Sequence, residues 1–317
     1  MEPISYEQKK ERIHEEFLRL KDKKEPDDRV VLGGKETTNL FRYRTTKEEN
    51  RLNLSNLTSH IFDIDKEVVH AEGMSSYVSL VSAILPFNYI PAVVPQLKTI
   101  TIGGAVSGGG IESSSFRQGF VHETIDTMEI LTGRGDIITC SREKNSDLFF
   151  GFPVSYGTLG YALKLSARVI PIKPFIQIDY SRHTSPTLFF NDLEKSCSDD
   201  SLDFIDGVVF SQKDMYLNKA RFVDQAPFES DYTHQNIYYK SIPKIKSDFL
   251  STENYLWRWD TDWFWCSKHF FFQHPLVRTI IGKKYLNSKT YMKLKNFAHT
   301  HPFLFSVFGK QKQRESV

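Results

Sequence analysis

The sequence has little cysteine and no long apolar run. Its three cysteines, Cys140, Cys197 and Cys266, are far apart and include no CxxC pair. This pattern argues against a disulfide framework and against a cysteine-bound zinc or iron–sulfur site, and it indicates a reducing compartment. No stretch reaches the roughly 18 consecutive apolar residues typical of a membrane span. The charged N-terminus lacks the apolar core of a signal peptide, so we expect a cytoplasmic protein.

A large excess of charge of one sign is also lacking. Lys plus Arg number 41 and Asp plus Glu number 39, which leaves a net charge of +2 over 317 residues. Proteins that bind nucleic acid usually carry a larger basic excess, so we expect no nucleic-acid partner. Hydrophobic residues make up 40% of the chain and aromatic residues 14%, which is typical of a folded protein. The length predicts two domains.

Helix and strand patterns are mixed along the chain, which predicts an α+β fold. Residues 5–24 have the pattern of an amphipathic helix that begins with a capping box at Ser5 and Gln8. Residues 124–140 read as a hairpin around a glycine turn. Further strands are expected at 30–32, 61–65, 67–72, 160–170, 175–182 and 204–210, and further helices at 74–85 and 187–197.

The strand pattern at 160–170 is the most regular one. Apolar residues alternate with polar ones along this segment, which predicts a half-buried strand. One face is expected to carry Tyr161, Leu163, Leu165, Ala167 and Val169.

Glycines cluster in a segment that suggests an anion site. Five glycines fall within the eight residues 103–110. Glycine allows a backbone to approach a ligand closely, and successive N–H groups then form a nest suited to a pyrophosphate. The spacing fits neither the Rossmann fingerprint nor the P-loop. On glycine content alone, a flexible surface loop is an equal alternative.

The order of motifs resembles a known family. The segment TIGGAVSGGGIESSSFRQG precedes TGRGDIITCSREKNSDLFFGFPVSYGTLGYALKLSARVIPIKP. This series is similar to the FAD-binding domain of the vanillyl-alcohol-oxidase-like flavoproteins, and within them to the delta(24)-sterol reductase (Diminuto-like) branch. GIESSS, NSDLFF and GTLG are its specific points. The resemblance spans residues 28–300 and is strongest over 90–175.

The resemblance implies a domain layout. We expect an N-terminal helix within 1–27, a two-subdomain PCMH-type FAD-binding domain over 28–173, and an α+β cap domain over 174–317. Pro171 and Pro174 bracket the second boundary. Members of the family continue further, so the cap is expected to be incomplete and the chain to be a shortened form.

The resemblance also implies where FAD binds. The first loop would be 31–39 and the second 101–115, with the GTLG turn on the adenine side. Because the first loop lacks the histidine that tethers FAD in many members, we expect non-covalent FAD. Lys98 is a further candidate for the FAD phosphate, with a solvated lysine as the alternative. The expected FAD contacts are Gly33, Gly34, Lys35, Thr101, Ile102, Gly103, Gly104, Ser107, Gly110, Glu112, Ser113, Ser114, Gly157 and Gly160.

The aromatic segment 255–265 is the candidate substrate wall. Its four tryptophans suit a flat or long apolar substrate, and Arg258 or Asp260 would orient it or donate a proton. Tyr238 is a further candidate proton donor. The alternative is a packed contact between the two domains in which Arg258 satisfies the nearby aspartates. No histidine and carboxylate spacing indicates a metal, so none is expected.

These features favour an FAD-dependent oxidoreductase acting on a C=C bond of a sterol-like or isoprenoid lipid. NADPH as hydride donor is implied by the resemblance alone. Two alternatives stay open, namely an FAD-linked oxidase or dehydrogenase of an alcohol or sugar, and a non-catalytic flavin-binding fragment or partner subunit. Residues 280–317 hold eight lysines or arginines and one acid. This basic tail is expected to contact an anionic membrane surface, with a solvated terminus as the alternative.

Overall fold

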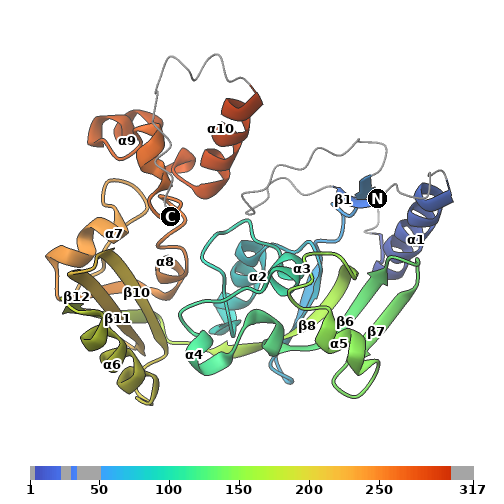
Figure 1. Cartoon of the computed structure of the whole chain (residues 1–317), viewed down its shortest axis with the longest axis horizontal. Coiled ribbons are helices and arrows are strands. Elements are labelled where there is room, and N and C mark those ends of the chain that lie inside the picture. Colours follow the sequence, from blue (N-terminus) through green and yellow to red (C-terminus); the bar gives the residue numbers. More distant parts are fainter. Residues whose placement is uncertain (1–3, 23–29, 34–50, 301–317) are drawn as a thin grey trace.

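Two sheets organise the molecule. The computed structural model describes residues 4–22, 30–33 and 51–300. A six-stranded sheet and a four-stranded sheet lie next to one another, each with its own helices (Figure 1). The first sheet's last strand ends at Pro171 and the second sheet's first strand begins at Phe175. The predicted α+β class is confirmed, whereas the domain limits at 27 and 173 stay predictions.

The six-stranded sheet is antiparallel throughout. Its strands follow the order β3–β4–β8–β6–β7, and β5 also pairs with β8. The predicted hairpin around the glycine turn is confirmed as β6 and β7. A separate pair of short strands, β1 and β2, is parallel. The bounds are β1 Val31–Gly33, β2 Arg51–Asn53, β3 His60–Asp63, β4 Val68–Glu72, β5 Tyr89–Pro91, β6 Ile125–Thr132, β7 Ile137–Ser141 and β8 Gly160–Pro171.

A bulge in β8 changes which side chains share a face. Lys164 is paired with Glu129, but the next residue of β6 is paired with Ala162, so Leu163 has no opposite residue. An extra residue of this kind shifts the alternation. As a result, Leu165 packs in the core under α2 (Tyr77–Ile84) and α3 (Ile102–Gly108), whereas Tyr161 and Leu163 pack against α1 (Tyr6–Asp22). The prediction that Tyr161 and Leu163 share a face with Leu165 is therefore wrong.

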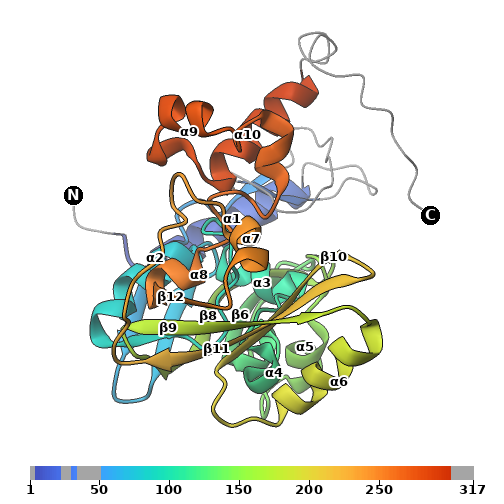
Figure 2. The same cartoon turned by 90° about the vertical axis from the view of Figure 1, so that its left-hand side faces the viewer.

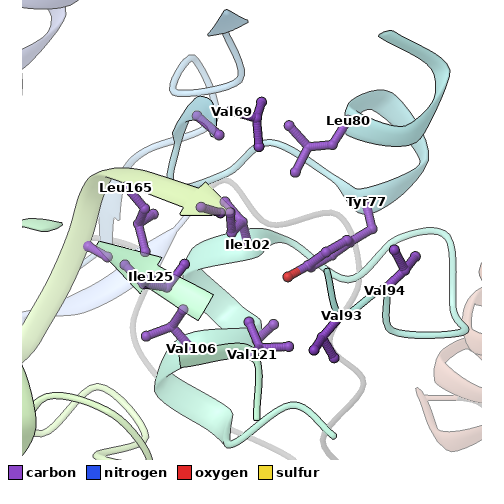
Figure 3. Packing of buried hydrophobic residues seen from close by; sticks show 14 of the residues in the cluster. Val69, Tyr77, Leu80, Val93, Val94, Ile102, Val106, Val121, Ile125 and Leu165 are labelled. Atoms are coloured by element: carbon purple, nitrogen blue, oxygen red, sulfur yellow. The ribbon is translucent and has the colours of Figure 1, made fainter. Parts of the chain in front are cut away.

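The largest core lies between one face of this sheet and two helices, α2 (Tyr77–Ile84) and α3 (Ile102–Gly108). Figure 3 shows Tyr77 and Leu80 from α2 meeting Ile102 and Val106 from α3 beside strand residues such as Leu165. These side chains are almost fully buried. Burial of apolar area at about 25 cal/mol per Å² makes this core the main stabilising contact of the first part.

Helix α1 (Tyr6–Asp22) packs on the other face of the sheet. The predicted capping box is confirmed, because Gln8 Oε1 accepts from Ser5 N at 3.0 Å and Ser5 Oγ accepts from Gln8 N at 3.3 Å. The helix buries Ile13 and Phe17, and Lys9 Nζ forms an ion pair with Glu72 at 2.9 Å. Helix α1 thus fixes the end of β4 that leads into the site described below.

The four-stranded sheet is antiparallel and follows the order β10–β11–β9–β12. Its bounds are β9 Phe175–His183, β10 Phe204–Ser211, β11 Asp214–Val223 and β12 Ser247–Ser251. Helix α6 (Pro186–Cys197) covers one face, and an aromatic core that includes Tyr238 and Trp259 covers the other. The sequence patterns predicted β9, β10 and α6 but missed β11 and β12.

Short helices complete the structure. Helices α9 and α10 stand on the side of the four-stranded sheet away from α6 (Figure 2). Among the described residues, no helix combines the length and apolarity needed to cross a bilayer. The remaining helices are α4 Ser115–Gln118, α5 Ser146–Gly151, α7 Tyr238–Ser241, α8 Thr252–Leu256, α9 Pro275–Ile281 and α10 Ser288–Thr300, with 3₁₀ turns at Leu85–Phe87, Val121–Thr124, Ile242–Lys244, Cys266–Phe270 and Lys283–Tyr285.

Candidate functional site

A cavity of about 700 Å³ lies between the two parts of the chain. Its volume is within the roughly 300–1,000 Å³ typical of ligand sites. One wall holds Ser76 and Thr101, the N-cap residues of α2 and α3, which also form an isolated β-bridge. The opposite wall holds Asp260, Lys283, Lys284 and residues 286–289. The cavity therefore brings the predicted FAD-binding and cap regions together.

Asp260 joins the two walls. Its Oδ1 accepts hydrogen bonds from the backbone N of Lys98 at 3.0 Å and from Ser288 Oγ at 2.6 Å. The side chain is 2% exposed, and burial raises the pKa of its carboxyl above the ordinary value, although both hydrogen bonds oppose the shift. Of the three predicted catalytic residues, Asp260 is the one that lines this cavity.

The cavity lining is basic and rich in hydroxyl groups. It contains Lys98, Lys283, Lys284 and Lys289, and Asp260 is the single carboxylate among its lining residues. The hydroxyl of Thr99 is buried and has no hydrogen-bond partner among the described residues. Its oxygen is inaccessible from the cavity, so Thr99 lines the wall through other atoms. The lining suits an anionic group.

The glycine-rich segment folds as helix α3 and not as an open loop. Gly103 N donates to Gly73 O at 3.0 Å, and Gly104 N donates to Thr101 Oγ1 at 3.3 Å. The prediction that these amides form a free anion nest is therefore wrong for these two residues. A Cβ on Gly103 would lie 2.8 Å from Gly73 O, so glycine is needed here for close backbone packing. Thr101 lines the cavity, whereas Ile102 is buried in the first core.

The GIESSS segment connects the two parts of the chain. The carbonyl of Ser113 accepts from Ile205 N at 2.8 Å, at the end of the second sheet, and its hydroxyl lies 3.3 Å from Tyr255 Oη. Ser114 Oγ donates to Ala92 O at 2.9 Å. With Glu112 and Arg258, these residues line a pocket of about 10 Å³, which is large enough for a single water. The segment forms a domain junction beside the large cavity.

Glu112 is the strongly perturbed acid of this junction. Its Oε1 accepts from Gln96 N at 2.9 Å. Burial raises the pKa of Glu112 from 4.5 to about 8, with Arg258 lowering it and Asp206 raising it. Between about pH 4.5 and pH 8, the folded protein therefore retains a proton on Glu112 that the unfolded chain has released.

The raised pKa of Glu112 predicts a pH-dependent stability. Because the folded form binds this proton more tightly, the contribution of Glu112 to the free energy of unfolding should fall as pH rises from about 4.5 to about 8 and then level off. Glu112→Gln should remove this fall. Urea unfolding across that range checks the result, with Glu253→Gln, an exposed change in α8, as control. Equal pH slopes for wild type and Glu112→Gln would contradict the assignment.

Arg258 is buried within this junction and does not line the large cavity. Its guanidinium donates to Asp206 Oδ2 at 2.5 Å and to Tyr255 O at 2.6 Å, and it lies 3.8 Å from the centre of the Tyr255 ring. The side chain is 3% exposed. These contacts favour the packed domain contact over a role as proton donor.

Tyr238 lies in the aromatic core of the second part. Its ring packs edge-on against Trp259 and Tyr232, with ring centres 5.0 Å and 5.3 Å apart. Burial raises the pKa of its phenol above the ordinary value. Tyr238 lines neither pocket, so its placement favours packing over proton transfer.

The other predicted FAD contacts are more scattered. Ser107 O accepts from Tyr156 N at 2.9 Å, which places the 156–160 turn beside the end of α3. Gly157 and Gly160 in that turn have positive φ angles of 82° and 134°. Gly110 packs within the first part, where a Cβ would lie 2.8 Å from Val121. Gly33 ends β1, and Gly34 and Lys35 lie outside the described residues.

Sequence reasoning missed the cavity-lining residues Thr99, Ser288 and the lysines at 283, 284 and 289. The sequence pattern placed these lysines only in the basic tail at 280–317. Their positive charge was a usable signal, but their position opposite Lys98 depends on tertiary structure. Among the described residues, no group of three or more histidine, cysteine or carboxylate side chains could hold a metal ion.

One protein family matches the first part of the chain. Residues 22–141 match the family described as "FAD binding domain". This range covers the first sheet up to the end of β7 and includes α2 and α3. The chain therefore contains a segment that matches an FAD-binding domain, and the resemblance seen in the motif series is confirmed.

The curated relatives are oxidoreductases by name. Human "Delta(24)-sterol reductase" is 26% identical over 215 residues, which cover 68% of this chain and 40% of that protein. The Pisum sativum enzyme of the same name is 34% identical over 124 residues, or 38% of this chain and 22% of its own length. "Cytokinin dehydrogenase 9" of Oryza sativa is 32% identical over 177 residues, or 51% and 33%. The chain spans less than half the length of these relatives.

The residues present fit FAD. The cavity offers hydroxyl side chains at both helix N-caps and lysines that suit an anionic cofactor. Thr101 and Lys98 would hold the cofactor from the first part, and the lysines at 283, 284 and 289 would face it from the second. When bound, FAD supplies hydride transfer, and the protein supplies position and electrostatics.

Proposed function

We propose that this protein is an FAD-dependent oxidoreductase that reduces a C=C bond of a sterol-like or isoprenoid lipid, with NADPH as hydride donor and FAD bound non-covalently. The observation that carries the proposal is the FAD-binding domain at 22–141, together with similarity to human delta(24)-sterol reductase over 215 residues. The cavity between this domain and the second part supports it as the place where cofactor and substrate meet.

The chain's own residues have defined parts in this proposal. Reduction of a C=C bond needs a proton for the carbon that does not receive hydride. Asp260 is the candidate source, because burial raises the pKa of its carboxyl and it lines the cavity. Ser288 and Lys98 fix the position of that carboxyl through their hydrogen bonds.

An anaerobic reduction experiment tests the proposal. Purified protein loaded with FAD should lose its oxidised flavin absorption on addition of NADPH, and a suitable unsaturated sterol should restore it. A flavin that stays oxidised with NADPH would contradict the proposed donor. A flavin that NADPH reduces, but that no unsaturated lipid reoxidises, would contradict the proposed substrate class.

A second function is favoured by the rice relative and by the polar cavity. Cytokinin dehydrogenase 9 covers 51% of this chain, and few of the cavity's lining residues are apolar, namely Met74, Val78 and Leu286. These observations suit an FAD-linked oxidase or dehydrogenase of an alcohol or sugar. Rapid reoxidation of the reduced flavin by air with release of peroxide would support this function over the first.

A further inference from the structure

We propose that residues 265–285 form a surface that docks on an anionic lipid bilayer, which we call the α9 surface. The segment contains α9 and the 3₁₀ turns on either side of it. Figure 2 shows α9 at the end of the molecule opposite α6. The inference goes beyond the proposed function, and the contact with the bilayer does not depend on FAD binding.

Helix α9 has its polar and apolar sides reversed. Its charged residue, Arg278, is fully buried, whereas Leu276 is 68% exposed and Ile280 is 84% exposed. At 3.6 residues per turn, Leu276 and Ile280 share one side of the helix and lie about 160° around it from Arg278. A surface helix of a globular protein normally buries its apolar side. The reversal therefore indicates an apolar partner outside the described residues.

The fold fixes this reversed orientation. Arg278 Nη1 lies 2.7 Å from Asp262 Oδ1, and the guanidinium also donates to two backbone carbonyls. Asp262 is buried as well, so a rotation of α9 that covered Leu276 and Ile280 would separate a buried ion pair. The two apolar side chains are therefore held outward in the folded protein.

Exposed aromatic side chains flank the helix. Trp265, Phe271 and Tyr285 are each more than half exposed. Tryptophan and tyrosine are enriched where proteins meet the membrane–water interface, because their rings are apolar and their edges are polar. Aromatic and aliphatic side chains in one segment thus suit the boundary between lipid headgroups and acyl chains.

The charge of the segment selects a lipid surface as the occupant. Residues 263–300 contain seven lysines or arginines and no aspartate or glutamate. A lysine close to an anionic leaflet contributes about 1 kcal/mol to binding. A second copy of the same surface would instead place like charges opposite one another, which disfavours a symmetric dimer. The exposed lysines of this stretch are Lys268, Lys283, Lys284 and Lys293.

The α9 surface adjoins the cavity. Lys283 and Lys284 follow α9 almost directly, and both line the cavity. Contact with a bilayer would therefore bring a source of lipid substrate next to the cavity wall. This consequence rests on the proposed function, whereas the membrane contact itself does not.

Vesicle flotation tests the α9 surface. The full chain, without added FAD, is mixed with phosphatidylcholine vesicles that contain or lack phosphatidylserine. Wild type should bind the vesicles with phosphatidylserine, and sodium chloride should weaken this binding. Leu276→Ser/Ile280→Ser should bind roughly tenfold more weakly, because two inserted apolar side chains are lost. The matched control is Leu188→Ser/Phe190→Ser, which removes two exposed apolar side chains from α6 and should bind like wild type.

Three results would overturn the α9 surface. The first is wild type that binds neither kind of vesicle, or both kinds equally. The second is a loss that is absent from Leu276→Ser/Ile280→Ser or equally large in the α6 control. The third is a wild-type dimer in gel filtration that Leu276→Ser/Ile280→Ser converts into monomers, which would assign the surface to a second copy.

A flavin titration keeps this proposal separate from the proposed function. Leu276 and Ile280 do not line the cavity, so Leu276→Ser/Ile280→Ser should bind FAD with wild-type affinity. A loss of FAD binding in this variant would show a structural role for the two residues and would overturn the α9 surface. Wild type that binds vesicles but no FAD would contradict the proposed function alone.

Discussion

Gly73→Ala is expected to abolish FAD binding and to lower the free energy of unfolding by about 3 kcal/mol. A Cβ at this position would lie 2.0 Å from the carbonyl oxygen of Ala162 in β8. That oxygen belongs to the backbone of a central strand and cannot move aside. Gly73 also donates to Leu163 O at 2.8 Å and accepts from Gly103 N at 3.0 Å. The change would therefore push α3, and with it Thr101, away from the cavity wall.

The matched control for this change is Gly108→Ala at the end of α3. A Cβ on Gly108 would meet no atom within 4 Å, and the residue is helical. Alanine is the better helix former, so this variant should be neutral or more stable by up to about 1 kcal/mol. Urea unfolding and FAD titration compare the two variants. A Gly73→Ala protein that matches Gly108→Ala in both measurements would contradict the packing described for β8 and α3.

Arg278→Met is expected to cost about 3–5 kcal/mol, because it leaves a buried carboxylate without its cation. Arg278 is fully buried and lies 2.7 Å from Asp262 through Nη1. It also donates to the carbonyls of His234 and Phe272. These bonds attach α9 to the segment that contains Asp260. The variant should therefore loosen the second cavity wall and weaken FAD binding as well as the fold.

A double-mutant cycle separates the ion pair from general packing. Arg278→Met/Asp262→Leu removes both charges, so it should destabilise the protein by clearly less than the sum of the two single changes. The free energies of unfolding of the four proteins give the coupling directly. Additive effects would show that the two side chains do not depend on one another and would contradict this account of the α9 segment.

Local patterns in the sequence predicted much of the fold. Helix α1 and its capping box, the β6–β7 hairpin and helix α6 depend on contacts close in sequence, and all three are confirmed. The bulge at Leu163 was not predictable, because it depends on which residue of β6 lies opposite. Strand β11 was missed although it is central to the second sheet.

The sequence predicted the candidate site less well than it predicted the fold. Glycine content predicted a loop at 103–110, but α3 covers 102–108, and its first amides, those of Ile102 and Gly103, donate to the carbonyls of Ser75 and Gly73. The aromatic neighbours of Asp260 predicted a functional role for it, and the structure places it in the cavity wall. The opposing lysines at 283 and 284 lie about 180 residues from Lys98 along the chain, so no local pattern joins them.

The most direct test of this account is an absorbance spectrum of the chain after incubation with FAD and removal of free flavin by gel filtration. We predict that oxidised flavin bands elute with the protein and that acid precipitation releases all of the flavin into the supernatant. Release is expected because residues 31–39, where the resemblance predicts the first FAD loop, contain no histidine to tether FAD. Protein that elutes without flavin would contradict the central claim that this chain binds FAD, and flavin that stays with the precipitate would contradict non-covalent binding.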